Sequence, residues 1–388
     1  MSLKDQFLIR PDIHFLNFGS FGAAPKPVFE AYQKWQLLLE QESVQFIAFD
    51  GPKYLAEARQ ALATYINCDN KDNLVFVTNP SYAVNIVARG LDLKEGDEIL
   101  ATDIEYGACD RTWDFYCTEK KAVYRRQHIT LPVTTKEQFV EDFFKGYNEK
   151  TKAVFISHIT SATALILPVK EICAKAKELG LITIVDGAHV PGHIPFDLST
   201  IQADFYTGAC HKWMMAPKGC SFLYAHPSVQ HYCDPLVVSW GYKAAKPSNS
   251  QFLDYHQMIG TRDFSAFCTL PTCVEFMAKH NWPEVARYYR NMVREQAPRF
   301  FELLNSKPIS PLTDHWLGQM ISIKINTDQP ELLQRTLFTD YKIEVPIMVQ
   351  NADIYLRYSL NAFNTIEDLD ALYNALVQCK ECGLFKSN

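Results

Sequence analysis

The chain has 388 residues, of which 47% are hydrophobic, and a formal net charge of −6 at pH 7. That is enough apolar material for one large core or for a large and a small domain, and the mildly acidic charge argues against binding to nucleic acid or to an anionic membrane. No apolar run is long enough to span a bilayer. Eleven scattered cysteines favour a reducing, cytoplasmic setting over a disulfide framework.

Short β-rich runs alternate with helical runs through the first part of the chain. Strands are predicted at residues 73–78, 97–103, 122–129, 152–159, 181–186, 203–209 and 220–225. Helices are predicted between them at residues 81–91, 107–121, 136–147 and 168–180. Alternation of this kind predicts βαβ units and a mostly parallel sheet that is covered on both faces.

The pattern changes near residue 264. Helices are predicted at residues 283–305, 329–341 and 367–383, and strands at 320–326, 342–347 and 354–360. The sequence therefore predicts an α/β protein with a large domain at residues 19–263, built on a mixed, mostly parallel central sheet. A smaller α+β domain would contain residues 264–388 together with residues 1–18.

Polar side chains follow five of the predicted strands, at the edge where open α/β sheets place their sites. They include Asn79, Ser81, Tyr82, Tyr106, Ser161, Asp186, His189, His211 and Lys212. Each alone has a structural explanation, as a helix cap, a turn residue, a core aromatic or a surface lysine. Lys212, however, lies between His211 and Trp213, a poor place for simple solvation. A desolvated lysine has a lowered pKa and becomes a usable nucleophile.

A lysine, an acid and a helix N-terminus together are the parts of a pyridoxal 5'-phosphate site. Lys212 would form a Schiff base with the cofactor aldehyde, Asp186 would keep the pyridine nitrogen protonated, and backbone N–H groups would hold the phosphate. The sequence thus predicts an enzyme that removes the α-proton of an amino-acid substrate.

Several segments carry a family resemblance, and they occur in the expected order along nearly the whole chain. They are DIEYGACDRTW (103–113), SHITSATALILPV (157–169), VDGAHVPG (185–192), HKW (211–213), GTRDFSAF (260–267) and LRYSLNAFNT (356–365). The chain resembles pyridoxal phosphate enzymes of fold type I in the class V aminotransferase family. Within that family it is most similar to the isopenicillin N epimerase-like branch.

This resemblance implies further roles. Tyr106 would stack on the cofactor ring, and Ser161 and His189 would approach its phenolic oxygen. The phosphate would be held by Ser81, the Tyr82 backbone and His211, and Asn79 would also bind the cofactor. Arg357 would bind the α-carboxylate of the substrate as a bidentate fork. Thr261 would reach the phosphate of a neighbouring subunit, so a homodimer is implied.

The reaction itself is left open by the sequence. The resemblance favours epimerisation, and the alternatives are a C–S β-lyase of the cysteine desulfurase or kynureninase type, an aminotransferase, and a non-catalytic relative. The segment VPIMVQNADIYLR (345–357) has no cysteine, which argues against a persulfide-forming desulfurase. The spacing in GSFGAAP (19–25) is wrong for a nicotinamide-binding turn, and no metal-binding motif is present. Residues 17–25, 237–242 and 347–353 are expected to line the substrate side of the pocket.

Overall fold

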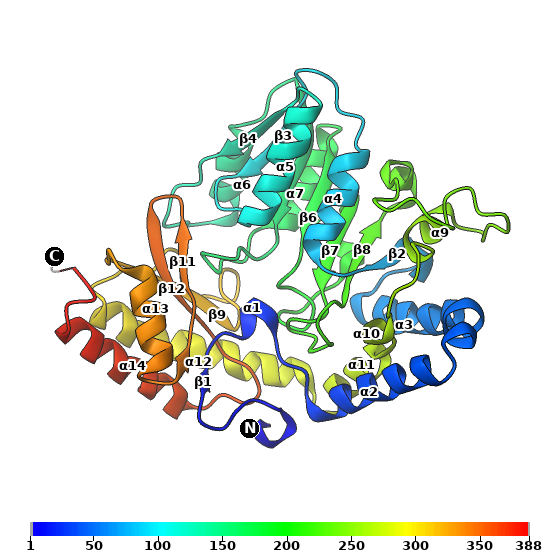
Figure 1. Cartoon of the computed structure of the whole chain (residues 1–388). Coiled ribbons are helices and arrows are strands. Elements are labelled where there is room, and N and C mark those ends of the chain that lie inside the picture. Colours follow the sequence, from blue (N-terminus) through cyan, green and yellow to red (C-terminus); the bar gives the residue numbers. More distant parts are fainter. Residues whose placement is uncertain (1–2, 387–388) are drawn as a thin grey trace.

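A seven-stranded mixed sheet forms the centre of the computed structural model, which describes residues 3–386 (Figure 1). Its strands are β2 Leu74–Val77, β3 Glu98–Thr102, β4 Val123–Gln127, β5 Thr151–Ser157, β6 Ile182–Asp186, β7 Phe205–Ala209 and β8 Ser221–Ala225. Their order is β2-β8-β7-β6-β5-β3-β4. Strands β7, β6, β5, β3 and β4 run parallel, and β8 lies antiparallel between β2 and β7. The predicted mostly parallel sheet is confirmed.

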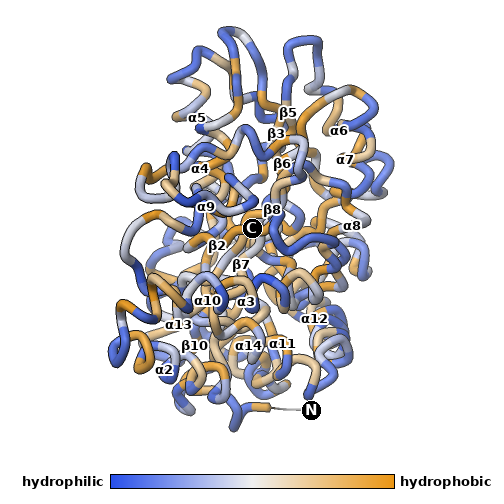
Figure 2. The backbone as a smooth tube through the Cα atoms, turned by 90° about the vertical axis from the view of Figure 1, so that its right-hand side faces the viewer, coloured by the Kyte–Doolittle hydropathy of each residue, from blue (hydrophilic) through white to orange (hydrophobic). Residues whose placement is uncertain are grey.

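The sheet is buried on both faces. Along β5, Val154 and Ile156 pack into one apolar core, whereas Ala153 and Phe155 pack into a second core on the opposite face. Side chains alternate across a strand, so a strand covered on both sides must be apolar at every position. This explains the nearly continuous apolar runs of the sequence, and Figure 2 shows the hydrophobic colour concentrated along the inner strands.

Helices from several parts of the chain cover the two faces. Those that connect the strands are α4 Pro80–Gly90, α5 Gly107–Glu119, α6 Lys136–Phe144, α7 Val169–Glu178 and α8 Leu198–Ile201. Those of the flanks are α1 Phe18–Phe21, α2 Lys26–Gln41, α3 Gly51–Ile66, α9 Gln251–Gln257, α10 Ser265–Cys268 and α11 Leu270–Lys279. The two long helices α2 and α3 were not predicted. Among the helices of residues 3–386, none combines the length and the apolar composition that crossing a bilayer requires.

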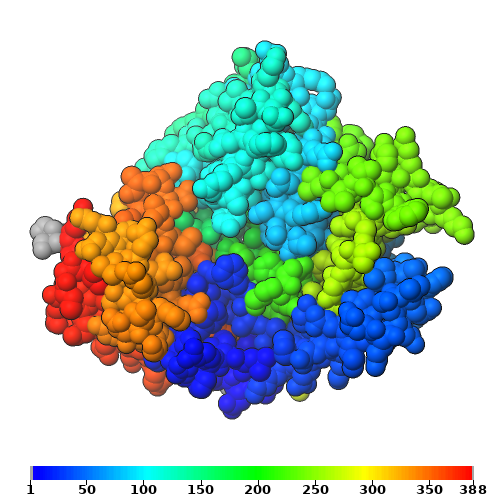
Figure 3. Space-filling model, viewed as in Figure 1, coloured from blue at the N-terminus to red at the C-terminus, as the bar shows by residue number. Residues whose placement is uncertain are grey.

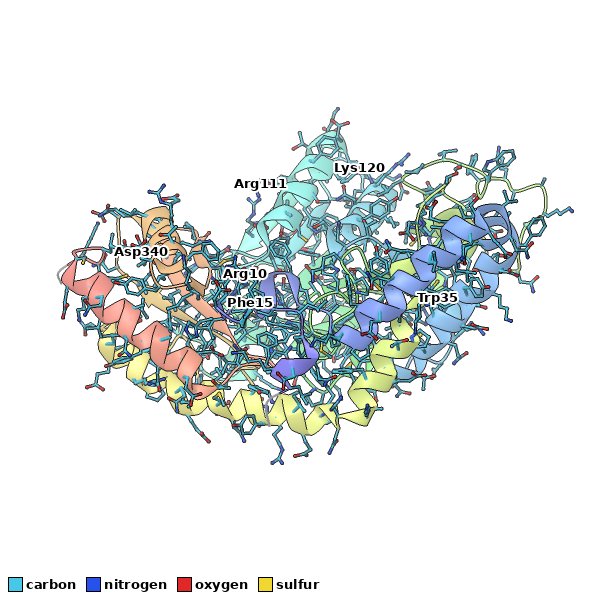
Figure 4. All side chains as sticks on the ribbon, turned by 60° about the horizontal axis from the view of Figure 1, so that its bottom comes forward. Arg10, Phe15, Trp35, Arg111, Lys120 and Asp340 are labelled. Atoms are coloured by element: carbon cyan, nitrogen blue, oxygen red, sulfur yellow. The ribbon has the colours of Figure 1, made fainter. Side chains whose placement is uncertain are left out.

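The C-terminal part packs against the long helix α12 Trp282–Leu303. A three-stranded antiparallel sheet in the order β11-β12-β9 contains β9 Met320–Ile325, β11 Ile347–Gln350 and β12 Asp353–Ser359. Helices α13 Pro330–Thr339 and α14 Ile366–Glu381 complete it. Trp35 of α2 and Asp340 at the end of α13 lie at opposite flanks of the molecule (Figure 4). The domain boundary at residue 264 stays a prediction.

The N-terminal residues join the C-terminal elements. Strand β1 His14–Phe15 pairs in parallel with β10 Ile343–Glu344, and in the space-filling view the dark blue N-terminal segment lies beside the orange part of the C-terminal region (Figure 3). The single strand predicted at residues 342–347 is wrong. The chain forms β10 and β11 on either side of Val345 and Pro346, because a proline has no N–H to donate to a strand ladder.

Candidate active site

A cavity of about 280 Å³ opens at the carboxyl ends of the parallel strands. The predicted site residues that line it are Asn79, Ser81, Tyr106, Ser161, Asp186, His189, His211 and Lys212. They come from the segments that follow β2, β3, β5, β6 and β7, which end at the same edge of the sheet. Tyr82 and Thr261 are not among the lining residues, and Thr261 is exposed. The role of Thr261 therefore stays a prediction.

Lys212 lies in the turn that follows β7. Protein atoms enclose it, while part of its side chain remains open to the cavity. Removal from water lowers the pKa of Lys212 to about 8, and the positive charge of Arg357 acts in the same direction. Compared with an ordinary lysine, a much larger share of this side chain is therefore the free amine near neutral pH, which is the nucleophilic form.

His189 explains how the cavity accommodates that free amine. Its Nε2 lies 3.1 Å from Lys212 Nζ, and its Nδ1 accepts a hydrogen bond of 3.3 Å from the indole N–H of Trp213. Burial lowers the pKa of His189 well below its usual range, so the ring is neutral. A neutral imidazole that accepts at Nδ1 carries its proton on Nε2. When Lys212 is the free amine, the Nε2–H of His189 is therefore placed to donate to its lone pair.

Asp186 ends β6 and is buried on the floor of the cavity. Its Oδ1 accepts the Ala188 N–H at 2.9 Å, and Cys109 Sγ lies 3.6 Å from its Oδ2. Burial raises the pKa of Asp186, whereas the Ala188 N–H and the charge of Lys212 lower it. A positive group bound at this carboxylate would offset the penalty of burying its charge.

Arg357 lies in the interior of β12 and is buried. Its Nη1 donates to the carbonyl oxygen of Ser161 at 2.6 Å, and its Nη2 donates to Ser20 Oγ at 3.0 Å. Its Nε has no hydrogen-bond partner among the described residues. Burial lowers the pKa of Arg357 to about 10, which still leaves the guanidinium charged at neutral pH. The two contacts hold this cation beside Ser20 and Ser161, which both line the cavity.

The N-terminal segment supplies cavity residues that the strand-end argument missed. Ser20 and Phe21 of α1 line the cavity, as expected for residues 17–25. The next residue, Gly22, has φ of +64°, and a Cβ atom there would lie 2.4 Å from the carbonyl oxygen of His211 and 2.5 Å from that of Lys212. Only a glycine allows this close approach of two backbones.

The other two segments predicted to line the substrate side do not line this cavity. Neither residues 237–242 nor residues 347–353 are among its lining residues. Trp240, which is predicted to line the substrate side, is instead 82% exposed. The interpretation failed because hydrophobicity alone does not tell which surface a loop residue faces.

The N-terminus of α4 provides the part of the cavity suited to an anion. Asn79 caps the helix, since its Oδ1 accepts the Tyr82 N–H at 2.9 Å, and Pro80 occupies the first turn. His211 Nδ1 lies 3.1 Å from the Cys220 carbonyl oxygen, which orients the ring. Helix N-termini attract negative charge. The predicted phosphate contact of the Tyr82 backbone stays a prediction, because that N–H already donates to Asn79.

Helix α5 begins beside the cavity, which its N-cap residue Tyr106 lines. Tyr106 precedes it and is 44% exposed, so one face of its ring is available to a ligand. The neighbouring Glu105 is buried and accepts from Ser157 N at 2.8 Å and from Thr102 Oγ1 at 2.7 Å. Burial raises the pKa of Glu105 to about 8 in spite of these hydrogen bonds. This carboxyl ties the start of α5 to the end of β5.

These features fit pyridoxal 5'-phosphate. An enclosed amine with a lowered pKa suits the aldehyde, a buried carboxylate suits the ring nitrogen, and a helix N-terminus suits the phosphate. The site and the fold therefore define a pyridoxal phosphate-dependent enzyme of fold type I. The class V aminotransferase family matches residues 24–372, and the chain belongs to this family.

Known proteins that resemble the chain agree with this assignment. It is 31% identical to isopenicillin N epimerase from Streptomyces clavuligerus, over 96% of both chains. It is 25% identical to a probable chloroplastic L-cysteine desulfhydrase from Arabidopsis thaliana, over 94% of this chain and 82% of that one. A C-DES variant with glycine covalently linked to its pyridoxal phosphate has a similar fold, with a TM-score of 0.85, 21% identity and coverage of 97% and 99%.

Proposed function

We propose that the protein epimerises an amino acid by removing and returning the proton on its α-carbon. The observation that carries this proposal is a cavity lined by Lys212 and Asp186, with Arg357 bonded to its lining residues Ser20 and Ser161. The chain is also similar to isopenicillin N epimerase over 96% of its length. Bound at this site, pyridoxal phosphate supplies a sink for the electrons left on the α-carbon when its proton departs.

Different residues in and beside the cavity would bind the cofactor and the substrate. Asp186 would hold the ring nitrogen as a cation, and Asn79, Ser81 and His211 would hold the phosphate. Arg357 would bind the α-carboxylate of the substrate, and its contacts with Ser20 and Ser161 would keep its fork oriented.

Epimerisation needs a proton carrier on each face of the α-carbon. Lys212 would exchange the proton on one face, because it lines the cavity and its lowered pKa of about 8 lets the amine take up and release a proton near neutral pH. Tyr106 lines the same cavity and is partly exposed, so its hydroxyl is the candidate for the opposite face.

A C–S β-lyase is the second candidate. The chain resembles several cysteine desulfhydrases, including the Arabidopsis protein at 25% identity over 94% of this chain and 82% of that one. Loss of the α-proton is common to both reactions, and the two differ only in whether a β-substituent then leaves. Transamination, in which the amino group of the substrate would pass to a keto-acid acceptor, is a further alternative.

A panel of L- and D-amino acids in deuterium oxide distinguishes these reactions. An epimerase gives the opposite enantiomer with deuterium at the α-carbon, a lyase gives a keto acid and ammonia from cysteine or cystine, and an aminotransferase requires a keto-acid acceptor. The Lys212→Ala variant is the control for all three. A holoenzyme that gives keto acid without any deuterated enantiomer would refute the epimerase proposal.

We further propose that the enzyme is a cytoplasmic homodimer in which Thr261 contacts the cofactor phosphate of the neighbouring subunit. Its exposed position in the loop between α9 and α10 is compatible with a contact across an interface. All eleven cysteines are unpaired, as expected for a reducing compartment. Sedimentation of the holoenzyme tests the dimer, and a monomer that is fully active would refute the role of Thr261.

A further inference from the structure

Cys109 lies directly behind the carboxylate that faces the cofactor ring. It is the third residue of α5, is fully buried, and does not line the cavity. Its Sγ is 3.6 Å from Asp186 Oδ2, within the range of a hydrogen bond that involves sulfur. Asp186 Oδ1 is held from another direction by the Ala188 N–H at 2.9 Å. One oxygen is thus bonded by the backbone and the other by a thiol.

Two features place the thiol in this position. Arg111, two residues further along α5, points out of the molecule (Figure 4). Residues two apart lie on different faces of a helix, so Cys109 faces the sheet. The first turn of α5 is held against the strand ends by Glu105, which accepts hydrogen bonds from both the backbone N–H and the hydroxyl of Ser157. Ser157 pairs with Asp186 in the sheet. The contact is therefore built into the junction of α5, β5 and β6.

We propose that Cys109 is a positioning residue, whose thiol donates a hydrogen bond to Asp186 Oδ2 and so keeps this carboxylate ionised and oriented toward the cofactor's ring nitrogen. This inference rests on the cofactor and is independent of which reaction the enzyme catalyses. It assigns a role to a residue that contacts neither the substrate nor the cofactor.

The charges around the pair determine the direction of the hydrogen bond. The titratable groups that surround Cys109 and Asp186 are Glu105, Tyr106, Asp110, Tyr206 and Lys212. Burial raises the pKa of Cys109 well above its usual range, and the negative charges of Asp186, Glu105 and Asp110 raise it further. The thiol therefore keeps its proton and donates, and the same contact lowers the pKa of Asp186.

Loss of this donor has a defined effect on the bound cofactor. Without the thiol, Asp186 holds a proton more strongly, and the ring nitrogen loses part of its positive charge. The nitrogen of Lys212, when joined to the bound cofactor, would then be more basic, because the ring would withdraw fewer electrons from it. The pH midpoint of the visible absorbance change of the holoenzyme should then move upward.

The test is a pH titration of that absorbance in the holoenzyme and in Cys109→Ala and Cys109→Ser. We expect Cys109→Ala to raise the midpoint by up to about 1 pH unit. One hydrogen bond of ordinary net strength changes the pKa of Asp186 by about that much, and the ring transmits part of this change. Cys109→Ser keeps a donor and should stay near the wild-type midpoint. Cys117→Ala is the matched control, because this cysteine is buried on the same helix and has no contact with Asp186.

The proposal is overturned if Cys109→Ala leaves the midpoint unchanged, or if Cys109→Ser shifts it as far as Cys109→Ala does. If Cys109→Ala does not fold, the ¹⁵N chemical shift of isotope-labelled cofactor in wild type and Cys109→Ser replaces it. Both should show a protonated ring nitrogen, and an unprotonated one in wild type would also overturn the proposal. Neither measurement requires the natural substrate, so failure here is distinct from failure of the proposed epimerisation.

Discussion

The contact between the N-terminal segment and the lysine turn leads to a prediction about Gly22. Its backbone has φ of +64° and ψ of −178°, a region that is essentially restricted to glycine and that strains other residues by about 1–3 kcal/mol. A Cβ atom would also lie 2.4 Å from the His211 carbonyl oxygen and 2.9 Å from Lys212 Cα, so backbone would have to move. Such overpacking destabilises by about 1–3 kcal/mol. Gly22→Ala should therefore lose about 2–6 kcal/mol of stability.

Gly180→Ala is the matched control for this variant. Gly180 follows α7, has φ of +69°, and has no atom within 4 Å of the place where its Cβ would lie. Its substitution should lose only the backbone contribution, about 1–2 kcal/mol. Scanning calorimetry of both holoenzymes measures the difference, and the rate of cofactor uptake should fall in Gly22→Ala alone, because the displaced turn carries Lys212. Equal melting temperatures for the two variants would refute the close approach.

The remaining predictions concern the ionisable groups of the site. Cofactor uptake by the apoenzyme should accelerate with pH with a midpoint near 8, because only the neutral amine of Lys212 reacts and its pKa is about 8; stopped-flow absorbance measures this, and a midpoint near 10 would contradict it. Arg357→Lys should lower kcat/KM about 10- to 100-fold, mainly through KM. The donors of a lysine all radiate from one nitrogen and lack the planar fork that bonds Ser20 and Ser161 and would also bind a carboxylate, and each charged hydrogen bond contributes about 1.5–3 kcal/mol. Arg287→Lys on the surface of α12 is its control, and equal effects would refute the role of Arg357. Glu105 has a pKa of about 8 in the folded protein and of about 4.3 in the unfolded chain, so the folded state binds its proton more tightly. This proton stabilises the fold fully below about pH 4, and the stabilisation is lost as the pH rises to about 8. Chemical unfolding at several pH values should show that the free energy of unfolding of Glu105→Gln increases relative to that of the wild type from pH 5 to pH 8. A difference that does not change with pH would contradict this.

The central sheet and several residues of the candidate site can be predicted from the sequence. Apolar runs such as those of β5 and β6 indicate strands buried on both faces. Successive side chains of a strand point to opposite faces, so a run without polar alternation must be covered on both. A parallel sheet brings all its strand ends to one edge, so Asp186 and Lys212 can be placed in one site without knowledge of any tertiary contact. The split of residues 342–347 into two strands was missed, although Pro346 was its signal.

Contacts between segments distant in sequence were decided only by the tertiary structure. Ser20 and Arg357 are 337 positions apart, and Cys109 and Asp186 are 77 apart, yet each pair shares a hydrogen bond. Such pairs depend on how α1 and α5 pack against the sheet, which no periodicity records. The same holds for the exposed Trp240, whose apolar character suggested a pocket. Local pattern determines which residues are buried and in what element, whereas the packing of those elements determines which side chains meet.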